Sequence, residues 1–207
     1  FPEIELVSAY GFGVRDLGYY IPISKNIQTT FYGTLYSRGS WGVRNQTDYD
    51  KRYGYRGKFE LGFQQLKSGF PDNFNNNKAT ISWIHIKDPK SNPYWNFTSN
   101  VNFISDNNAK TDLDLSTDNY FKNSFNSDIN LSRNFPGKPI RAGAKFSLRQ
   151  NGISKNVSLT SPIINVNVSR VFPFKKYING TGAIAQMASR LGVNYNFESP
   201  YHQFLLQ

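Results

Sequence analysis

A strict two-residue period runs through residues 53–64, where apolar and polar side chains alternate. One parity carries Tyr53, Tyr55, Gly57, Phe59, Leu61 and Phe63, and the other carries Gly54, Arg56, Lys58, Glu60, Gly62 and Gln64. Successive side chains of a β-strand point to opposite faces of its sheet. The period therefore predicts a strand with one apolar face and one charged, hydrated face, and it returns in segment after segment of the chain.

The composition decides what kind of sheet this is. Only 38% of the 207 residues are hydrophobic and 16% are aromatic, so aliphatic side chains for a conventional packed core are scarce. Strands of an outer-membrane barrel need only one apolar side chain in two, because the lumen and the loops are polar. Disorder is the alternative for a chain rich in Asn and Ser, but alternating Tyr and Phe at this density argue against it. The sequence therefore favours an all-β, antiparallel transmembrane β-barrel meander.

No run of residues approaches the roughly 18 consecutive apolar side chains of a membrane-spanning helix, so a membrane would be crossed by strands. Phe1 is not followed by a basic and then an apolar region, so we expect no signal peptide in this sequence, as in a processed or truncated chain. Cysteine is absent, which excludes disulfides and thiolate metal sites within these residues.

The formal net charge of +10 predicts an acidic partner or an acidic surface. The basic residues are spread over alternate strand positions rather than gathered in one run, which argues against nucleic acid. On barrel strands these positions face the lumen, and the candidates for binding an anionic lipid there are Arg56, Lys58, Arg141, Lys145 and Arg149. The alternative is that these side chains only keep the interior hydrated.

Turn signals divide the chain into about ten strands, with short and long connections as in the wall of a larger outer-membrane barrel. We expect turns at residues 25–26, 39–40, 88–93, 135–139 and 151–152. Asn151-Gly152 is the strongest two-residue hairpin signal among them. Residues 41–67 form either one very long strand or two, and Ala183–Arg190 is a candidate for a short helical turn.

Motifs for catalysis and metal binding are missing. The two histidines, His85 and His202, lie far apart in the sequence, and there is no nucleophile elbow, zinc spacing or phosphate-binding glycine loop. The run Asp112–Asp118 has the rhythm of a calcium loop but lacks its glycine and final glutamate, and we interpret it as a solvated loop. We therefore expect no enzyme activity, no catalytic residues, no metal and no cofactor.

The three tryptophans, Trp41, Trp83 and Trp95, have two interpretations. With their tyrosine neighbours they form interfacial girdles on a membrane barrel, or they stack on sugars in a soluble β-sandwich. The alternation extends over too many strands for a single sugar platform, which favours lipid.

Short segments of the sequence resemble a known family. They are residues 18–20 (GYY), 36–42 (YSRGSWG), 51–53 (KRY), 88–94 (DPKSNPY), 100–103 (NVNF) and 169–175 (SRVFPFK). In order and spacing they resemble the barrel of the LptD family, lipopolysaccharide-assembly proteins of the bacterial cell outer membrane, in its Bacteroidota branch. The resemblance implies that residues 16–207 are the N-terminal part of a longer barrel, and that residues 1–15 are the junction from a periplasmic domain.

The resemblance also implies a function and partners. LptD proteins form a translocon that receives lipopolysaccharide and inserts it into the outer leaflet through a lateral opening between the first and last barrel strands. The implied partners are lipopolysaccharide, an LptE-like plug lipoprotein inside the barrel, the periplasmic lipopolysaccharide bridge proteins and outer-membrane lipids. Nucleic acid is not an expected partner.

Residues for the lateral gate follow from the same resemblance. Aligned through Tyr19-Tyr20, prolines that weaken the first strands of enterobacterial relatives fall at Gly18 and Gly33. Glycine weakens a strand without removing its N–H donor, and Pro22 lies nearby. The gate candidates are therefore Gly18, Pro22 and Gly33, and the alternative is that the two glycines only relieve barrel curvature.

Two other functions stay open at this point. One is a small outer-membrane diffusion porin made of these strands alone. The other is a soluble carbohydrate-binding β-sandwich, in which the alternating aromatic side chains would lie between two sheets.

Overall fold

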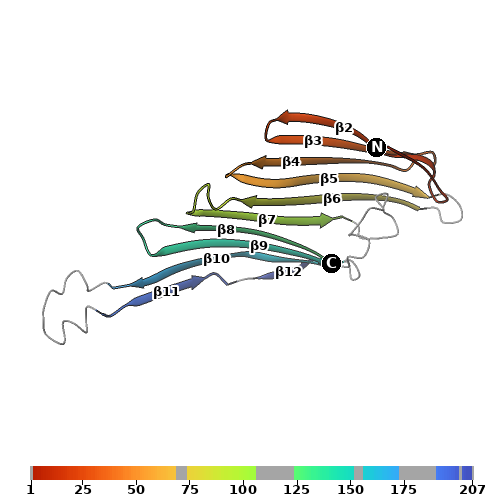
Figure 1. Ribbon diagram of the computed structural model, residues 1–207. Helices are drawn as coiled ribbons and strands as arrows, with labels where there is room; N and C mark the ends of the chain where they lie inside the picture. The colour runs from red at the N-terminus through yellow and green to blue at the C-terminus, as the bar shows by residue number, and fades with distance from the viewer. Residues whose placement is uncertain are drawn as a thin grey trace, which may run out of the picture.

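The computed structural model describes residues 2–68, 74–105, 124–151, 156–172, 190–200 and 202–206. These residues form one antiparallel sheet, whose strands lie side by side in chain order (Figure 1). The strands are β1 (Glu3–Val7), β2 (Gly11–Ser24), β3 (Ile27–Tyr36), β4 (Trp41–Lys51), β5 (Tyr55–Ser68), β6 (Phe74–Lys87), β7 (Trp95–Ile104), β8 (Ser124–Asn134), β9 (Ile140–Asn151), β10 (Val157–Val171), β11 (Val193–Glu198) and β12 (Gln203–Leu206). Within the described ranges, no helix is long and apolar enough to span a membrane.

The sheet is a meander, as the sequence predicted. Each strand from β1 to β11 pairs with the next, and β12 pairs with β10. The path ends at β1 and β11 without joining, so the described sheet is an open wall. The described residues form 12 strands rather than the expected ten or so, because the short strands β1 and β12 were not predicted.

Residues 41–67 divide into two strands at a tight turn. Tyr53 has a φ of +59°, and the Gly54 N–H donates to the Lys51 carbonyl at 2.8 Å, which reverses the chain between β4 and β5. The calcium-like run Asp112–Asp118 lies outside the described residues, as do residues 183–189 of the expected helical turn Ala183–Arg190 and Gly152 of the expected hairpin.

The register gives the sheet two chemically distinct faces. Phe59 pairs with Thr47 on β4 and Trp83 on β6, whereas the next residue, Glu60, pairs with Gln46 and Ser82. We call the first the apolar face and the second the polar face. The alternation expected for residues 53–64 is confirmed from Tyr55 on, whereas Tyr53 and Gly54 belong to the turn before β5.

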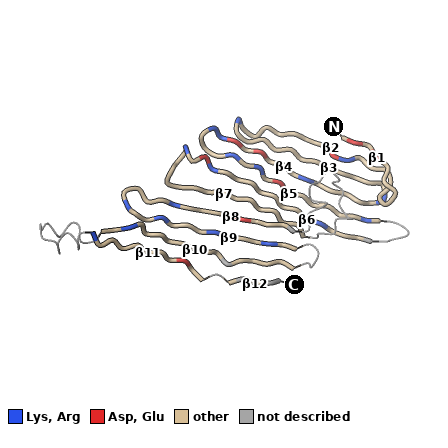
Figure 2. The backbone as a smooth tube through the Cα atoms, turned by 60° about the horizontal axis from the view of Figure 1, so that its bottom comes forward, with Lys and Arg blue, Asp and Glu red and all other residues tan. Residues whose placement is uncertain are grey.

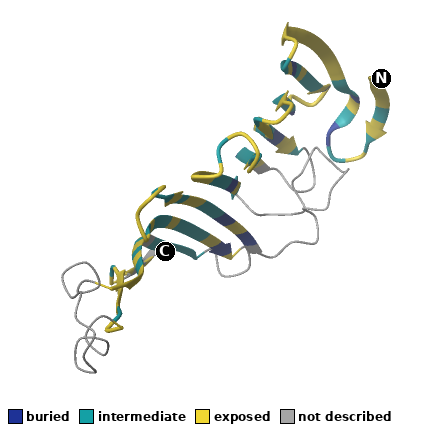
Figure 3. Ribbon diagram, turned by 60° about the vertical axis from the view of Figure 1, so that its left-hand side comes forward, coloured by how far each residue is buried: buried dark blue, intermediate teal, exposed yellow. Residues whose placement is uncertain are grey.

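Very few side chains are buried between layers, since the sheet is a single layer (Figure 3). The exception is a small core made of Tyr10, Tyr36 and Leu66, against which Val7 and Ala9 pack. The rings of Tyr10 and Tyr36 lie 5.6 Å apart, and Leu66 is fully buried. The turn between β1 and β2 therefore folds over one end of the sheet and fixes the N-terminal edge.

Candidate functional site

A β-bulge near the start of β2 directs two consecutive side chains to the polar face. Val14 pairs with Leu35 and Leu17 pairs with Gly33, so β2 uses one residue more than β3 over this interval. The extra residue is Asp16, whose φ is +55° and whose N–H faces the Thr34 hydroxyl at 3.4 Å. Asp tolerates this left-handed conformation better than most residues. Arg15 and Asp16 consequently lie together beside the neighbouring strands.

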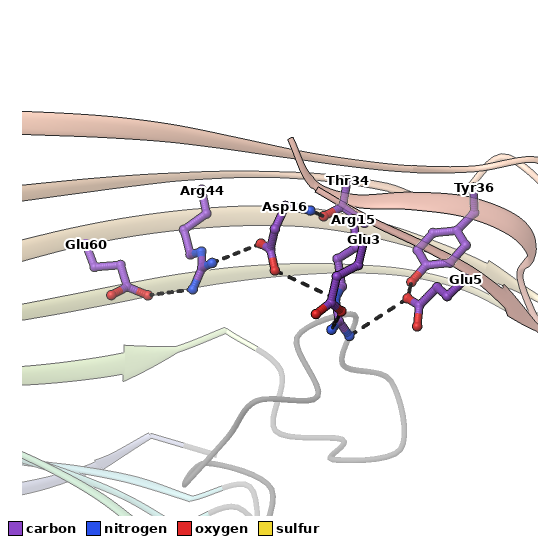
Figure 4. Close-up of polar contacts among 8 residues, drawn as sticks. All are labelled: Glu3, Glu5, Arg15, Asp16, Thr34, Tyr36, Arg44 and Glu60. Atoms are coloured by element: carbon purple, nitrogen blue, oxygen red, sulfur yellow. Dashed lines mark hydrogen bonds and ion pairs between the residues drawn. The ribbon is translucent and has the colours of Figure 1, made fainter. Parts of the chain in front are cut away.

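The bulge is the centre of a charged network on the polar face, which we call the charged ladder (Figure 4). Arg44 Nη2 lies 3.0 Å from Asp16 Oδ1, and Arg44 Nη1 lies 3.9 Å from Glu60 Oε1. Arg15 contacts Asp16 at 3.7 Å, Glu5 at 3.8 Å and also Glu3. The ladder therefore joins β1, β2, β4 and β5.

The charged ladder holds one more carboxylate than cation. Its carboxylates belong to Glu3, Glu5, Asp16 and Glu60, and its cations are Arg15, Arg44 and Lys58, whose Nζ lies 3.4 Å from Glu60 Oε2. The Tyr36 hydroxyl donates to Glu5. Four carboxylates against three cations leave no excess positive charge at the N-terminal edge.

The five predicted anion-binding residues all lie on the polar face, but in two groups. Arg56 and Lys58 line a recess near the turns 25–26 and 52–54, together with Lys25, Asp48 and Asp50. Arg141, Lys145 and Arg149 pair with the polar-face residues Asn134, Asn130 and Asn126 of β8. The sheet separates the two groups by β6, β7 and β8.

The five cations also differ in how far they are neutralised. Lys58 pairs with Glu60, and Lys145 Nζ lies 3.7 Å from Asp128 Oδ1. Arg141 Nε donates to the neutral Asn134 side chain at 2.7 Å. Arg56 and Arg149 have no ion pair with any residue that the structure describes. Arg56, Arg141 and Arg149 thus keep their charge available.

A groove on the polar face runs from the bulge of β2 across to β7 and β8. It is lined by the ladder residues Arg15, Asp16, Arg44 and Glu60 at one side, and by Lys78, Asn102, Ile104 and Phe125 at the other. Lys78 is buried in it. The groove offers cations and amides next to apolar side chains, which suits an amphiphile with an anionic head.

The three predicted gate residues come together in the β2–β3 hairpin. Gly18 pairs with Tyr32, Gly33 pairs with Leu17, and Pro22 pairs with Gln28 next to an irregularity before Ser24. β1 pairs with β2 only from Gly11 to Arg15. Beyond the bulge, the outer edge of β2 has no partner strand among the described residues, and Tyr19 is 71% exposed.

The two histidines and the acidic residues do not gather into a metal site within the described ranges. No group of three or more His, Cys, Asp or Glu side chains within the described ranges is arranged to hold a metal ion. His85 lies on the apolar face, where its Nδ1 is 2.9 Å from the Tyr49 hydroxyl. We define the aromatic cluster as Tyr49, Tyr55, Trp83, His85 and Phe97, whose ring centroids lie 5.2–6.1 Å from one another along a continuous chain.

Sequence reasoning did not find the charged ladder. Arg15, Asp16, Arg44 and Glu60 come from three strands, and no short motif links them. The only local signal is the pair Arg15-Asp16 between Val14 and Leu17, because two consecutive polar residues interrupt the period of two, as a bulge does.

Comparison with known proteins identifies the family. A search among curated proteins gives no significant match. The family model described as LptD protein matches residues 1–203, nearly the whole chain. The sheet fits this match, since it is an all-β antiparallel meander with one apolar and one polar face. The chain therefore belongs to the LptD family, whose members act in lipopolysaccharide transport at the outer membrane.

Proposed function

We propose that this sheet is the N-terminal wall of an outer-membrane translocon that releases lipopolysaccharide sideways through a lateral opening. The observation that carries the proposal is the free edge of β2 from Asp16 to Ser24, next to a strand pair weakened by Gly18, Gly33 and Pro22. A strand edge with unpaired N–H and C=O groups can pair with another strand and part from it. In this proposal, residues 1–15 join the wall to a periplasmic domain.

The polar face is the surface along which the anionic head moves. Its groove and the cations Arg56, Arg141 and Arg149, which form no ion pair among the described residues, attract phosphate groups, while the charged ladder holds the N-terminal edge together. The acyl chains leave at the β2 edge, where Leu17, Tyr19 and Ile23 are exposed on or near the apolar face. The partners are lipopolysaccharide, an LptE-like plug lipoprotein against the polar face, and the periplasmic bridge proteins.

Site-specific photo-crosslinking in cells tests which face meets the cargo. A photoreactive phenylalanine analogue is placed in the full-length protein at Gln64 or Asn102 on the polar face, and at the adjacent Phe63 or Phe103 on the apolar face. At Gln64 and Asn102 we expect lipopolysaccharide adducts that disappear when the periplasmic bridge is removed. At Phe63 and Phe103 we expect no adducts that require the bridge. Equal bridge-dependent adducts on both faces would overturn the assignment.

A diffusion porin has no specific support in the structure. The described sheet is an open path from β1 to β11 rather than a closed ring, and an open sheet with an exposed apolar face does not enclose an aqueous channel. A soluble β-sandwich needs a second sheet against the apolar face, and the described strands all belong to one sheet.

A further inference from the structure

Cationic side chains stacked on aromatic rings gather at one end of the sheet. Five of the six cation–π contacts in the described part of the chain lie near the C-terminal ends of β4, β6, β8 and β10. Figure 2 shows Lys and Arg at this end of the sheet as well as along the strands. We call this the cationic rim and define it as Arg52, Tyr53, Lys90, Trp95, Arg133, Phe135, Arg170 and Phe172.

Arg133 is the most constrained cation of the rim. It pairs with Trp95 on the apolar face, and its guanidinium carbon lies 4.7 Å from the ring centroid of Trp95 and 4.7 Å from that of Phe135. Arg133 is nevertheless exposed, and no described carboxylate forms an ion pair with it. The two rings thus flank the guanidinium of an exposed residue.

The position of Arg133 on the apolar face indicates how deep in the bilayer the rim lies. An arginine on the lipid-facing side of a barrel costs about 2–4 kcal/mol at the bilayer midplane and close to nothing near the interfaces. The aromatic cluster lies beside the rim on the same face, and tyrosine and tryptophan prefer the level of the headgroups. Trp83 and Tyr49 are hydrogen-bonded there at 2.7 Å. The rim therefore lies where lipid phosphates are.

Two further cation–aromatic groups extend the rim along the sheet. Tyr53 lies between the Arg52 guanidinium, 4.9 Å from its ring, and Lys90 Nζ, at 5.9 Å. Arg170 lies 5.6 Å from the Phe172 ring. The Asp88 carboxylate, which accepts from the Lys90 N–H at 2.8 Å, is close to the rim. Asp48 and Asp50 lie in the recess near the turn 52–54. The positive charge of the rim is therefore clearest at Arg133, with which no described carboxylate forms an ion pair.

The geometry points to a ligand that carries phosphate. Stacking on an aromatic ring covers one flat side of a guanidinium but does not neutralise it. The five N–H donors of arginine match two phosphate oxygens at once. Because Arg133 and Trp95 lie on the apolar face, the phosphate bound there belongs to a lipid whose acyl chains lie along that face.

We propose that the cationic rim binds the phosphate of membrane-lipid headgroups on the outside of the wall, with Arg133, between Trp95 and Phe135, as the main binding residue. This site is separate from the polar-face path of the cargo. It rests on the proposed function only in that the apolar face is embedded in the outer membrane. The role of this lipid-binding site is to hold the wall at a fixed depth in the outer membrane.

Lipid retention by the purified full-length protein tests this proposal. The protein in detergent is incubated with dioleoylphosphatidylglycerol or with a galactolipid that lacks phosphate, and native mass spectrometry counts bound lipids. We expect wild type to prefer phosphatidylglycerol, and Arg133→Ala to lower that retention about fivefold, as for loss of a charge-assisted hydrogen bond. Arg133→Lys should keep part of it, because lysine binds phosphate as a point charge.

Lys138→Ala is the matched control, since it removes one positive charge from the turn after β8 without touching the aromatic pair. Its retention should equal that of wild type. Folding of each variant is checked by heat-modifiable migration on SDS gels. Equal binding by Arg133→Ala and wild type, an equal loss with Lys138→Ala, or no preference for the phosphate lipid would overturn the proposal. None of these results bears on cargo movement along the polar face, which the crosslinking experiment tests separately.

Discussion

Arg44 on β4 lies 3.0 Å from Asp16 of β2, and so ties the bulged strand β2 to β4, two strands further along the wall. β3 lies between them and contributes Tyr32, whose ring centre is 4.7 Å from the Arg44 guanidinium carbon. The contact crosses two strand pairings, because the bulge turns the Asp16 side chain along the polar face. The free edge of β2 is thus fastened at the bulge and unsupported beyond it.

The Asp16–Arg44 contact should stabilise the N-terminal edge modestly. Both side chains are about a third exposed or less, at 33% and 27%, so solvent screening limits the pair to about 0.5–1 kcal/mol. We expect Asp16→Asn and Arg44→Gln each to lower the free energy of unfolding by about that amount, measured by heat-modifiable migration. The double variant should cost less than the sum, because the two residues share one interaction. Strict additivity would contradict the pairing.

The two gate glycines should respond differently to alanine. A Cβ on Gly18 would meet the Tyr32 ring carbons at 3.3 and 3.4 Å, whereas one on Gly33 would meet only the Leu17 carbonyl at 3.9 Å. Gly18→Ala therefore displaces the Tyr32 ring, and we expect it to cost about 1 kcal/mol. Gly33→Ala, the matched control, should be neutral or slightly stabilising, since alanine loses less backbone entropy than glycine. A larger cost at Gly33 would contradict this packing.

Gly57 should be the least replaceable glycine of β5. A Cβ there would lie 2.5 Å from the Ile84 carbonyl and 2.3 Å from the Tyr49 hydroxyl, and the carbonyl belongs to backbone that cannot move without breaking the β5–β6 pairing. We expect Gly57→Ala to cost about 2 kcal/mol or more, as overpacking does, and to lower the amount of folded protein in the outer membrane. Gly62→Ala is the control, because its Cβ meets the side chain of Thr80 at 2.5 Å, which can rotate. Similar losses in both variants would argue against the backbone clash.

How much the sequence could predict differs between the wall and the site. The two-residue period predicted the strands, the meander and the two faces, because side-chain direction along a strand depends only on parity. The period could not predict the bulge at Arg15-Asp16, which shifts parity by one residue, or the short strand β1, whose pairing with Gly11–Arg15 is a tertiary contact. Arg56 and Lys58 were correctly assigned to one face, but their partners depend on register, which the sequence does not fix.

Charge compensation should separate the predicted anion-binding residues into two classes. Arg56 and Arg149 have no ion pair among the described residues, whereas Lys58 and Lys145 lie 3.4 Å from Glu60 and 3.7 Å from Asp128. We expect Arg56→Ala with Arg149→Ala to reduce lipopolysaccharide crosslinking at Asn102 about threefold, as weaker electrostatic attraction of an anion requires. Lys58→Ala with Lys145→Ala should reduce the crosslinking less, because a neighbouring carboxylate already neutralises much of the charge of each of these lysines. Surface lipopolysaccharide, measured by an antibody on intact cells, provides the second readout. Equal effects of the two double variants would contradict the distinction.

Locking the free edge of β2 tests the lateral release of lipopolysaccharide most directly. In the full-length protein, a cysteine replaces Tyr20 on β2 and is combined with cysteines scanned along the strand that faces this edge in the closed barrel. The control is a disulfide between positions 30 and 46, which already pair within the wall. New surface lipopolysaccharide is then followed before and after a reductant. We predict that the edge disulfide stops its appearance, that the reductant restores it, and that the control disulfide has no effect. Continued release with the edge disulfide fully formed would contradict the lateral opening.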